Sequence, residues 1–278
     1  MSFRSGFGAV EKAAQSTNQN SGGSWFTIYW KDSTGQGDLK ILRNLSDDPI
    51  VVGLHEYIPC NDGKRRTFVC TKELDKNRRC PICEDMVQTN ADGTTRPYRP
   101  RDIAISLAVL REEKQISRGE FEYSDVTEEV EVTSEVAEKA KSLGLDLEVG
   151  EKLTVPQVGF VQNSLTNFWN NLNGFFARYG TIMDRDYAIT RHGNGLDTKY
   201  QIVPCDVVEE LRDPEKVEDR YKIAKLFHLS VQDYLEILGS EGYYKKHLGP
   251  DSDPAPAPSS NSAGSLSLQD QIREYRSK

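Results

Sequence analysis

The chain has 278 residues and a formal net charge of −8, and its hydrophobic share of 37% and charged share of 28% are those of an ordinary folded protein. No apolar run approaches the ~20 residues that cross a bilayer, and residues 1–6 lack the apolar core of a signal peptide. The five cysteines are odd in number and spaced as in metal sites, which argues against a secreted disulfide scaffold. We therefore expect a cytoplasmic protein that makes no contact with membranes.

The first half of the chain has the pattern of a β-rich domain. Residues 1–23 end in a run of Gly, Ser, Asn and Gln that predicts a flexible N-terminal arm. Short β-type runs follow at 25–30, 38–43 and 50–55, and another lies at 102–110. Short strands separated by turn residues are typical of a closed or partly closed barrel.

Potential metal ligands lie between these runs, in the spacing His55-x14-Cys70-x9-Cys80-x2-Cys83. A C-x2-C pair lets two thiolates bind one ion, and four such donors fill the tetrahedral shell of a structural zinc site. Cys60 is an alternative to His55 as the fourth ligand, and spacing alone does not decide between them. The sequence therefore predicts a structural Zn²⁺ ion with no open position for catalysis.

Charge is distributed unevenly along the chain. Residues 64–101 carry ten basic and five acidic side chains, although the whole protein is acidic. This concentration around the predicted metal site indicates a nucleic-acid surface, with a merely solvated face as the alternative. Residues 112–151 carry thirteen acidic and four basic side chains. We interpret them as a solvated insertion, with an acidic protein-contact surface as the alternative.

The rest of the pattern predicts, in chain order, a helix at 134–143 with Ser134 as its N-cap, an amphipathic helix at 163–179, a hairpin across 186–204, and mostly helical structure over 207–248. Residues 250–264 are rich in Pro, Ala and Ser and predict a disordered tail. Residues 265–275 have helical spacing and could form a short helix on meeting a partner.

The sequence contains none of the common enzyme signatures, such as a phosphate-binding loop, a dinucleotide fingerprint or a nucleophile elbow. Four carboxylates, Asp47, Asp48, Asp184 and Asp186, are the nearest approach to a Mg²⁺ cluster, but no lysine or glutamate pattern supports them. We therefore predict a protein that is not an enzyme and has no catalytic residues. A metal-dependent nuclease is kept as a lesser alternative.

Two stretches resemble the T4-type bacteriophage single-stranded DNA-binding proteins, the helix-destabilising proteins. The Cys70-x9-Cys80-x2-Cys83 spacing, with its Cys-Pro-x-Cys knuckle, matches that family, and His55 falls near its histidine ligand. The run from Asp184 to Tyr200 resembles the family hairpin D-R-D-[YF]-x-I-T-R-x-G-x-G-L-D-T-x-Y. The resemblance covers about residues 24–205 and favours His55 over Cys60.

The resemblance implies an α+β protein with four parts: a flexible arm at 1–23, an OB-fold-like β-barrel at 24–205 with an inserted zinc-binding loop at about 55–90, a helical extension at 206–249, and a disordered tail at 250–278. It implies a protein that coats and protects single-stranded DNA during phage replication, recombination and repair in the infected cell. Replication or recombination proteins would bind its C-terminal region. The chain departs from the family in its basic N-terminal arm, which has only Arg4 and Lys12, and in its tail, which lacks an acidic run.

Binding of this kind combines basic side chains on the phosphates with aromatic rings stacked on bases, each stack contributing ~1–3 kcal/mol. The residues expected to contact phosphates are Lys64, Arg65, Arg66, Arg78, Arg79, Arg99 and Arg101. The rings expected to stack are Tyr57, Phe68 and Tyr98, with Trp30 as a further candidate. A zinc-containing interaction adaptor in phage transcription or virion assembly is the main alternative function.

Overall fold

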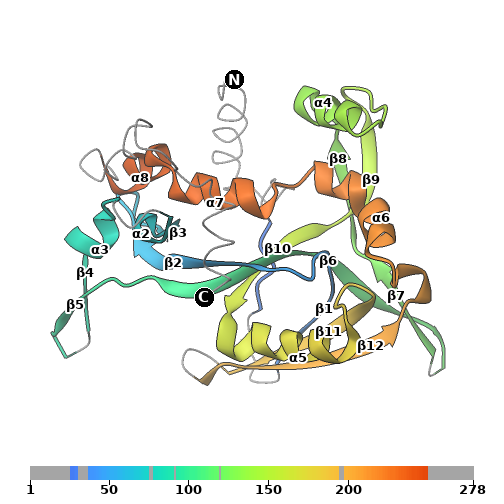
Figure 1. Cartoon of the computed structure of the whole chain (residues 1–278), viewed down its shortest axis with the longest axis horizontal. Helices are drawn as coiled ribbons and strands as arrows, with labels where there is room; N and C mark the ends of the chain where they lie inside the picture. The colour runs from blue at the N-terminus through green and yellow to red at the C-terminus, as the bar shows by residue number, and fades with distance from the viewer. Residues whose placement is uncertain are drawn as a thin grey trace. The chain divides into compact units, whose positions relative to one another are not determined.

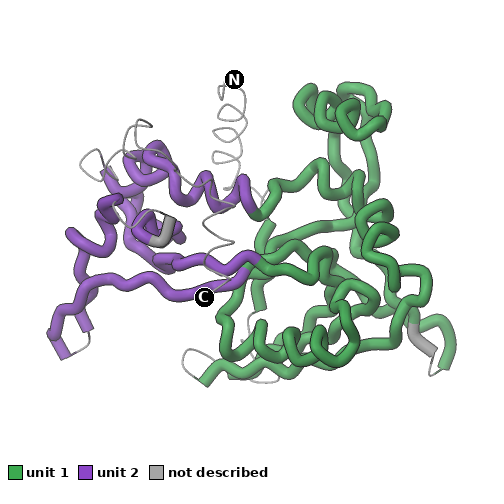
Figure 2. The backbone as a smooth tube through the Cα atoms, in the orientation of Figure 1, with its two compact units in different colours: residues 1–49, 105–231 green, residues 50–104, 232–278 purple. Residues whose placement is uncertain are grey.

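The computed structural model of the chain describes residues 26–30, 37–74, 78–90, 92–118, 120–193 and 197–249. The predicted arm at 1–23 and tail at 250–278 lie outside these ranges. The chain divides into two compact units (Figure 2): unit 1 is drawn from residues 1–49 and 105–231, and unit 2 from 50–104 and 232–278. The described part includes no helix with the length and apolar character needed to cross a membrane.

Unit 1 contains most of the strands (Figure 1). In chain order its elements are β1 (Asp38–Asn44), most of β6 (Arg101–Ser117), β7 (Glu120–Asp125), β8 (Thr127–Glu131), α4 (Ser134–Ser142), β9 (Lys152–Pro156), β10 (Val158–Ser164), the π-helical turn η1 (Leu165–Trp169), α5 (Asn170–Tyr179), β11 (Arg185–His192), β12 (Lys199–Val207), the 3-10 turn η3 (Glu209–Leu211) and α6 (Pro214–Leu226). The predicted strands at 38–43 and 102–110 and the predicted hairpin are present as β1, β6 and β11–β12.

The main sheet of unit 1 is mostly antiparallel. Strands β12, β11, β1 and β6 follow one another in that order, and β7 and β10 also pair with β6. Among the described strands β12 pairs with β11 alone, so this sheet is not closed into a barrel. The α+β class is confirmed, and the OB-fold-like barrel is not. Short strands with alternating apolar and polar residues occur in open and in closed sheets, because this sequence pattern does not show whether the two edge strands pair.

The strand predicted at 25–30 is replaced by a single parallel bridge between Thr27 and Phe160. The Ile28 backbone N–H donates to the Phe160 carbonyl at 2.9 Å. Gly159 permits this close approach, because a Cβ at that position would lie 2.7 Å from Phe26 Cδ1. The segment therefore packs on β10 without forming a longer ladder.

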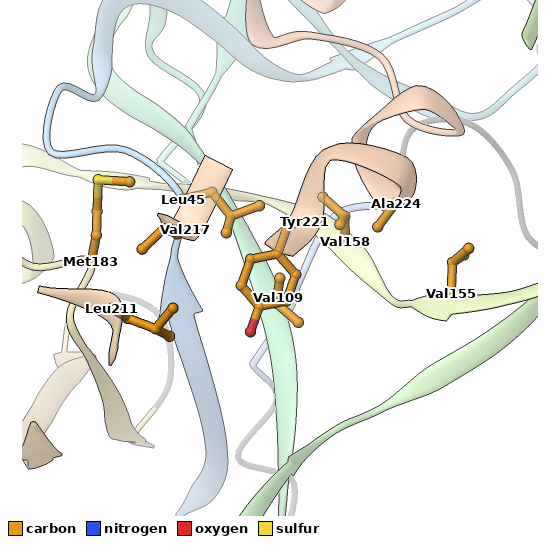
Figure 3. Packing of buried hydrophobic residues seen from close by; sticks show 9 residues of the cluster. All are labelled: Leu45, Val109, Val155, Val158, Met183, Leu211, Val217, Tyr221 and Ala224. Atoms are coloured by element: carbon orange, nitrogen blue, oxygen red, sulfur yellow. The ribbon is translucent and has the colours of Figure 1, made fainter. Parts of the chain in front are cut away.

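The core of unit 1 lies where α6 packs against the strands (Figure 3). Val217, Tyr221 and Ala224 recur at helical spacing along α6, and all three are buried. They join a cluster that comprises Leu45, Val109, Val155, Val158, Met183, Leu211, Val217, Tyr221 and Ala224. Burying a large apolar side chain stabilises the fold by ~1.5–3 kcal/mol, so this cluster is what holds α6 in place.

A buried ion-pair network lies in the same unit. Arg43 Nε is 2.9 Å from Asp186 Oδ1, and Arg111 Nε is 3.2 Å from the same oxygen. Arg111 also pairs with Asp125, which accepts a hydrogen bond from the Tyr221 hydroxyl at 3.1 Å. Strands β1, β6 and β11 and helix α6 are thus joined by polar contacts as well as by apolar packing.

Two predicted helices differ in detail from the structure. Helix α4 begins as expected, but its N-cap is Thr133 and not Ser134, because the Thr133 hydroxyl accepts the Val136 N–H at 3.3 Å. The helix predicted at 163–179 starts with the π-helical turn at Leu165–Trp169 before α5. Both differences involve the first turn, where sequence patterns are weakest.

Unit 2 is smaller and holds the predicted metal ligands. Its elements are β2 (Ile50–Pro59), β3 (Arg65–Val69), α2 (Thr71–Leu74), α3 (Pro81–Asp85), β4 (Val87–Thr89), β5 (Thr95–Pro97), the start of β6, nearly all of α7 (Val231–Gly239), and α8 (Glu241–Leu248). Strands β2 and β3 are antiparallel, and β4 and β5 form a short two-stranded ribbon. The helical region predicted at 206–249 is therefore divided, with α6 in unit 1 and α8 in unit 2.

Candidate metal centre

Four side chains of unit 2 bring their donor atoms into one cluster: His55, Cys70, Cys80 and Cys83. The donors all lie within 4.8 Å of one another. His55 Nε2 is 3.4 Å from both Cys80 Sγ and Cys83 Sγ, and Cys70 Sγ is 3.7 Å from Cys83 Sγ. Nitrogen and sulfur donors bound tetrahedrally at ~2.0–2.3 Å lie about 3.4–3.8 Å apart, so these four residues fit a four-coordinate metal ion.

Local backbone structure places each ligand. His55 lies on β2, and the Cys70 N–H at the end of β3 donates to the Gly53 carbonyl on β2 at 2.8 Å. Cys80 is the N-cap of α3, and Pro81 at the first helical position suits the start of a helix because its φ is fixed. The Glu84 N–H donates to the Cys80 carbonyl at 3.1 Å, so the two cysteines of the C-x2-C pair share one helical turn.

The three cysteine thiols of the cluster change one another's pKa. The Cys70 thiol donates a hydrogen bond that lowers the pKa of Cys80 to about 2, and His55 adds to this effect. The same hydrogen bond, together with burial, raises the pKa of Cys70. Burial and the negative charge on Cys80 raise the pKa of Cys83 to about 11. The metal-free cluster therefore disfavours three thiolates at once, and a bound cation would offset the repulsion among them.

The ligands lie in an apolar core that sequence reasoning missed. Cys70 and Cys80 are buried together with Ile58, Phe68, Ile82 and Tyr244. Tyr244 comes from α8, is fully buried, and donates its hydroxyl proton to the Val69 carbonyl at 2.6 Å. His55 Nδ1 is buried without a hydrogen-bond partner in the part of the chain that the structure describes, so packing orients the ring. No sequence signal connects α8 with a site so far away along the chain.

Cys60, the alternative ligand, is not part of the cluster. It lies in the turn between β2 and β3, where its Sγ is 3.5 Å from the Ile58 carbonyl oxygen. Burial raises the pKa of this thiol, which opposes formation of the thiolate that binds metal. Within the described ranges, the His/Cys cluster is the only group of three or more possible metal ligands.

The four carboxylates considered for Mg²⁺ do not converge on one site within the described chain. Asp184 pairs with Arg185 at 2.8 Å, and Asp186 belongs to the buried network with Arg43 and Arg111. Asp47 accepts hydrogen bonds from the Thr181 hydroxyl at 2.8 Å and the Ile182 N–H at 2.7 Å. These contacts hold the fold together, so they give the nuclease alternative no support.

The predicted phosphate contacts all fall in unit 2, with different surroundings. Lys64, Arg65, Arg99 and Arg101 are exposed, and Arg101 Nη1 lies 4.0 Å from Glu56 Oε2. Three others are half-buried: Arg66 pairs with Asp62 at 2.5 Å, Arg79 pairs with Glu84 at 3.5 Å and with Asp85, and Arg78 lies next to Arg79 in the chain. The exposed four are the ones best presented to a ligand.

The predicted stacking residues differ in their solvent exposure. Tyr57 has 68% of its surface exposed, whereas Phe68 is fully buried and packs edge-on against Tyr243 and Tyr244. Tyr98 is half-buried against the same core. Trp30 is buried, and its indole N–H donates to the Ile189 carbonyl at 3.1 Å. The expectations for Phe68 and Trp30 are therefore corrected, because neither ring presents a face to a base.

No protein-family model matches the chain, and no curated protein or solved structure matches it either. The resemblance to the T4-type single-stranded DNA-binding proteins therefore stays a prediction from sequence motifs. What the fold and the site define is a mixed α+β protein with a buried His/Cys cluster that could hold a metal ion.

Proposed function

We propose that this protein binds single-stranded DNA through a zinc-folded basic surface of unit 2. It coats and protects single strands during phage replication, recombination and repair. The observation that carries the proposal is that one compact unit contains both the metal-ligand cluster and every predicted phosphate contact.

The donor set supports zinc as the metal. Three cysteines and one histidine form one of the usual ligand sets of structural zinc, and the four donors leave no position open for a catalytic water. The ligands come from β2, from the end of β3 and from the start of α3, so one ion would join three parts of the unit. Its binding free energy would then stabilise the fold that carries the basic side chains.

The exposed arginines supply the chemistry of sequence-independent binding. Arg65 on β3 and Arg99 before β6 are both exposed, and a guanidinium can bind phosphate oxygens in a bidentate manner. Phosphates carry no base identity, so such contacts hold every sequence about equally. As the family resemblance implies, we further propose that the strands have an OB-fold-like arrangement. We also propose that the C-terminal region recruits replication or recombination proteins.

The salt dependence of binding tests the proposed surface. Each phosphate neutralised on a single strand contributes ~0.7 to the slope of log affinity against log salt. The Arg65→Gln, Arg99→Gln double variant is expected to reduce the magnitude of that slope by about 1.4 and to weaken oligo-dT and mixed sequences alike. Fluorescence anisotropy at several salt concentrations gives both quantities.

A matched control removes the same charge from unit 1. Lys139 and Lys141 are exposed on α4, within the acidic part of the chain. The Lys139→Gln, Lys141→Gln variant is expected to keep the wild-type slope. A wild-type slope in the arginine variant, or an equal loss in both variants, would show that residues 64–101 do not follow the phosphates.

A further inference from the structure

The pairing of β2 with β3 contains an irregularity beside the metal centre. His55 pairs with Phe68 and Ile58 pairs with Arg66, so two residues of β2 oppose one residue of β3. This arrangement is a β-bulge. Residues three apart in a regular strand point to opposite faces, yet His55 Nε2 lies 3.4 Å from Cys80 Sγ and Ile58 packs in the same apolar cluster as Cys80. The bulge is what turns both side chains inward, one to the metal cluster and one to the core.

Tyr57 lies in this bulge with a φ of 60°, and it is the one non-glycine residue with a positive φ in the described chain. A bulky side chain in the left-handed region is a backbone outlier, because its Cβ crowds the carbonyl oxygen. Bulges that need this conformation normally place glycine there. The backbone cannot relax easily, since His55 and Ile58 on either side are buried. The backbone therefore disfavours tyrosine at this position.

The Tyr57 ring also lies largely outside the core. Its exposure is 68%, whereas Phe68 on the facing strand is fully buried. A largely exposed aromatic ring on a backbone conformation that disfavours its side chain indicates a role beyond packing of the core. Two arginines lie near this part of β2: Arg65 is exposed on β3 opposite Pro59, and Arg101 Nη1 is 4.0 Å from the carboxylate of Glu56, the residue before Tyr57.

We infer that Tyr57 is a base-stacking residue, held outward by the β2 bulge as a fixed platform for an unpaired base. The inference rests on the proposed function, because stacking requires a single strand bound along unit 2. The ring brings two advantages: its face accepts any base, and its backbone is already fixed, so little conformational freedom is lost on binding. The strain is the cost of presenting the ring in one orientation.

Three substitutions at position 57 test this inference in the zinc-loaded, full-length protein. Tyr57→Gly and Tyr57→Ala are each expected to weaken oligo-dT binding by about 5-fold to 150-fold, the range expected for one lost base stack. The salt slope should stay at the wild-type value, because no phosphate contact is removed. Tyr57→Phe keeps the ring and should bind oligo-dT within about 2-fold of wild type.

Thermal unfolding of the same variants tests the strain separately. Glycine is usually less stable than alanine within a strand, but at a left-handed position the order reverses. Tyr57→Gly is therefore expected to melt above Tyr57→Ala, and at or above the wild-type protein. A glycine variant that melts below the alanine variant would contradict the inference that Tyr57 is held in a strained backbone conformation.

The oligo-dT binding measurements distinguish failure of this inference from failure of the proposed function. Wild-type protein that binds oligo-dT, with Tyr57→Gly binding equally well, would overturn the inference and leave the proposed function in place. Loss of affinity in Tyr57→Phe equal to that in Tyr57→Gly would exclude stacking in favour of a hydroxyl contact. Wild-type protein that does not bind oligo-dT would overturn both.

Discussion

Replacing Cys80 with serine is expected to remove the bound metal and to unfold the core of unit 2. Cys80 is fully buried, starts α3, and lies in one apolar cluster with Cys70, Ile82 and Tyr244. Structural zinc contributes an apparent ~10–16 kcal/mol in small zinc-folded modules, which is comparable to the whole stability of many domains. Elemental analysis should fall from about one zinc per chain to none, and protease should cleave the 64–101 segment faster.

Cys60→Ser is the matched control for this change. The Cys60 thiol lies in the same unit but outside the ligand cluster, so this variant should keep its zinc and its protease resistance. Retention of stoichiometric zinc by Cys80→Ser would contradict the site. Loss of zinc from Cys60→Ser, with retention by His55→Ala, would show that the alternative ligand set is correct.

Asp186→Asn is expected to destabilise the protein by about 3–5 kcal/mol, the range measured when one partner of a buried ion pair is removed. Asp186 is 2% exposed and lies within ion-pair distance of both Arg43 and Arg111. Arg43 is itself 1% exposed, and its two terminal nitrogens have no hydrogen-bond partner among the described residues. Without the Asp186 carboxylate, the buried Arg43 charge would lose the ion pair at 2.9 Å. Chemical denaturation measures the loss.

Glu135→Gln provides the comparison for an exposed pair. Glu135 pairs with Lys139 at 3.0 Å on α4, with both side chains almost half exposed. Such a pair on a helix contributes about 0.3–0.5 kcal/mol, so this variant should unfold close to wild type. Equal effects of the two substitutions would mean that the buried network does not hold the sheet and α6 together.

The metal ligands could be predicted from the sequence because their geometry is largely local. Cys80 and Cys83 share one helical turn, and that turn follows from the C-x2-C spacing and Pro81. The choice between His55 and Cys60 could not be made from spacing, because it depends on how β2 pairs with β3 and on the turn that holds Cys60 outside the cluster. A bulge changes the alternation of a strand without leaving a clear pattern in its composition.

The exposure of the aromatic side chains could not be predicted from the sequence. Phe68 is buried because Tyr243 and Tyr244 of α8 cover it, and the Tyr244 contact with Val69 joins residues 175 positions apart. The exposure of an aromatic ring depends on such distant partners, which alternation along a strand cannot reveal. Tyr57 and Phe68 therefore gave the same signal in the sequence and have opposite environments in the structure.

The hairpin motif that carries part of the family resemblance has a structural explanation. Asp186 closes the buried ion pairs, Tyr187 is fully buried, and Arg191 donates to the Trp30 carbonyl at 3.0 Å. Four of its charged residues, Asp184, Arg185, Asp186 and Arg191, thus make contacts within the protein. The motif indicates how the sheet is built, and the case for DNA binding depends on unit 2.

Titration of fluorescent oligo-dT against a duplex of equal length tests the central claim most directly. The zinc-loaded protein is expected to bind the single strand tightly and the duplex weakly, because paired bases offer no free face for stacking. Removing zinc with a chelator should abolish the difference together with the fold of unit 2. Binding of the duplex as tight as that of oligo-dT, or single-strand binding that survives complete removal of zinc, would contradict a zinc-folded single-stranded DNA-binding surface.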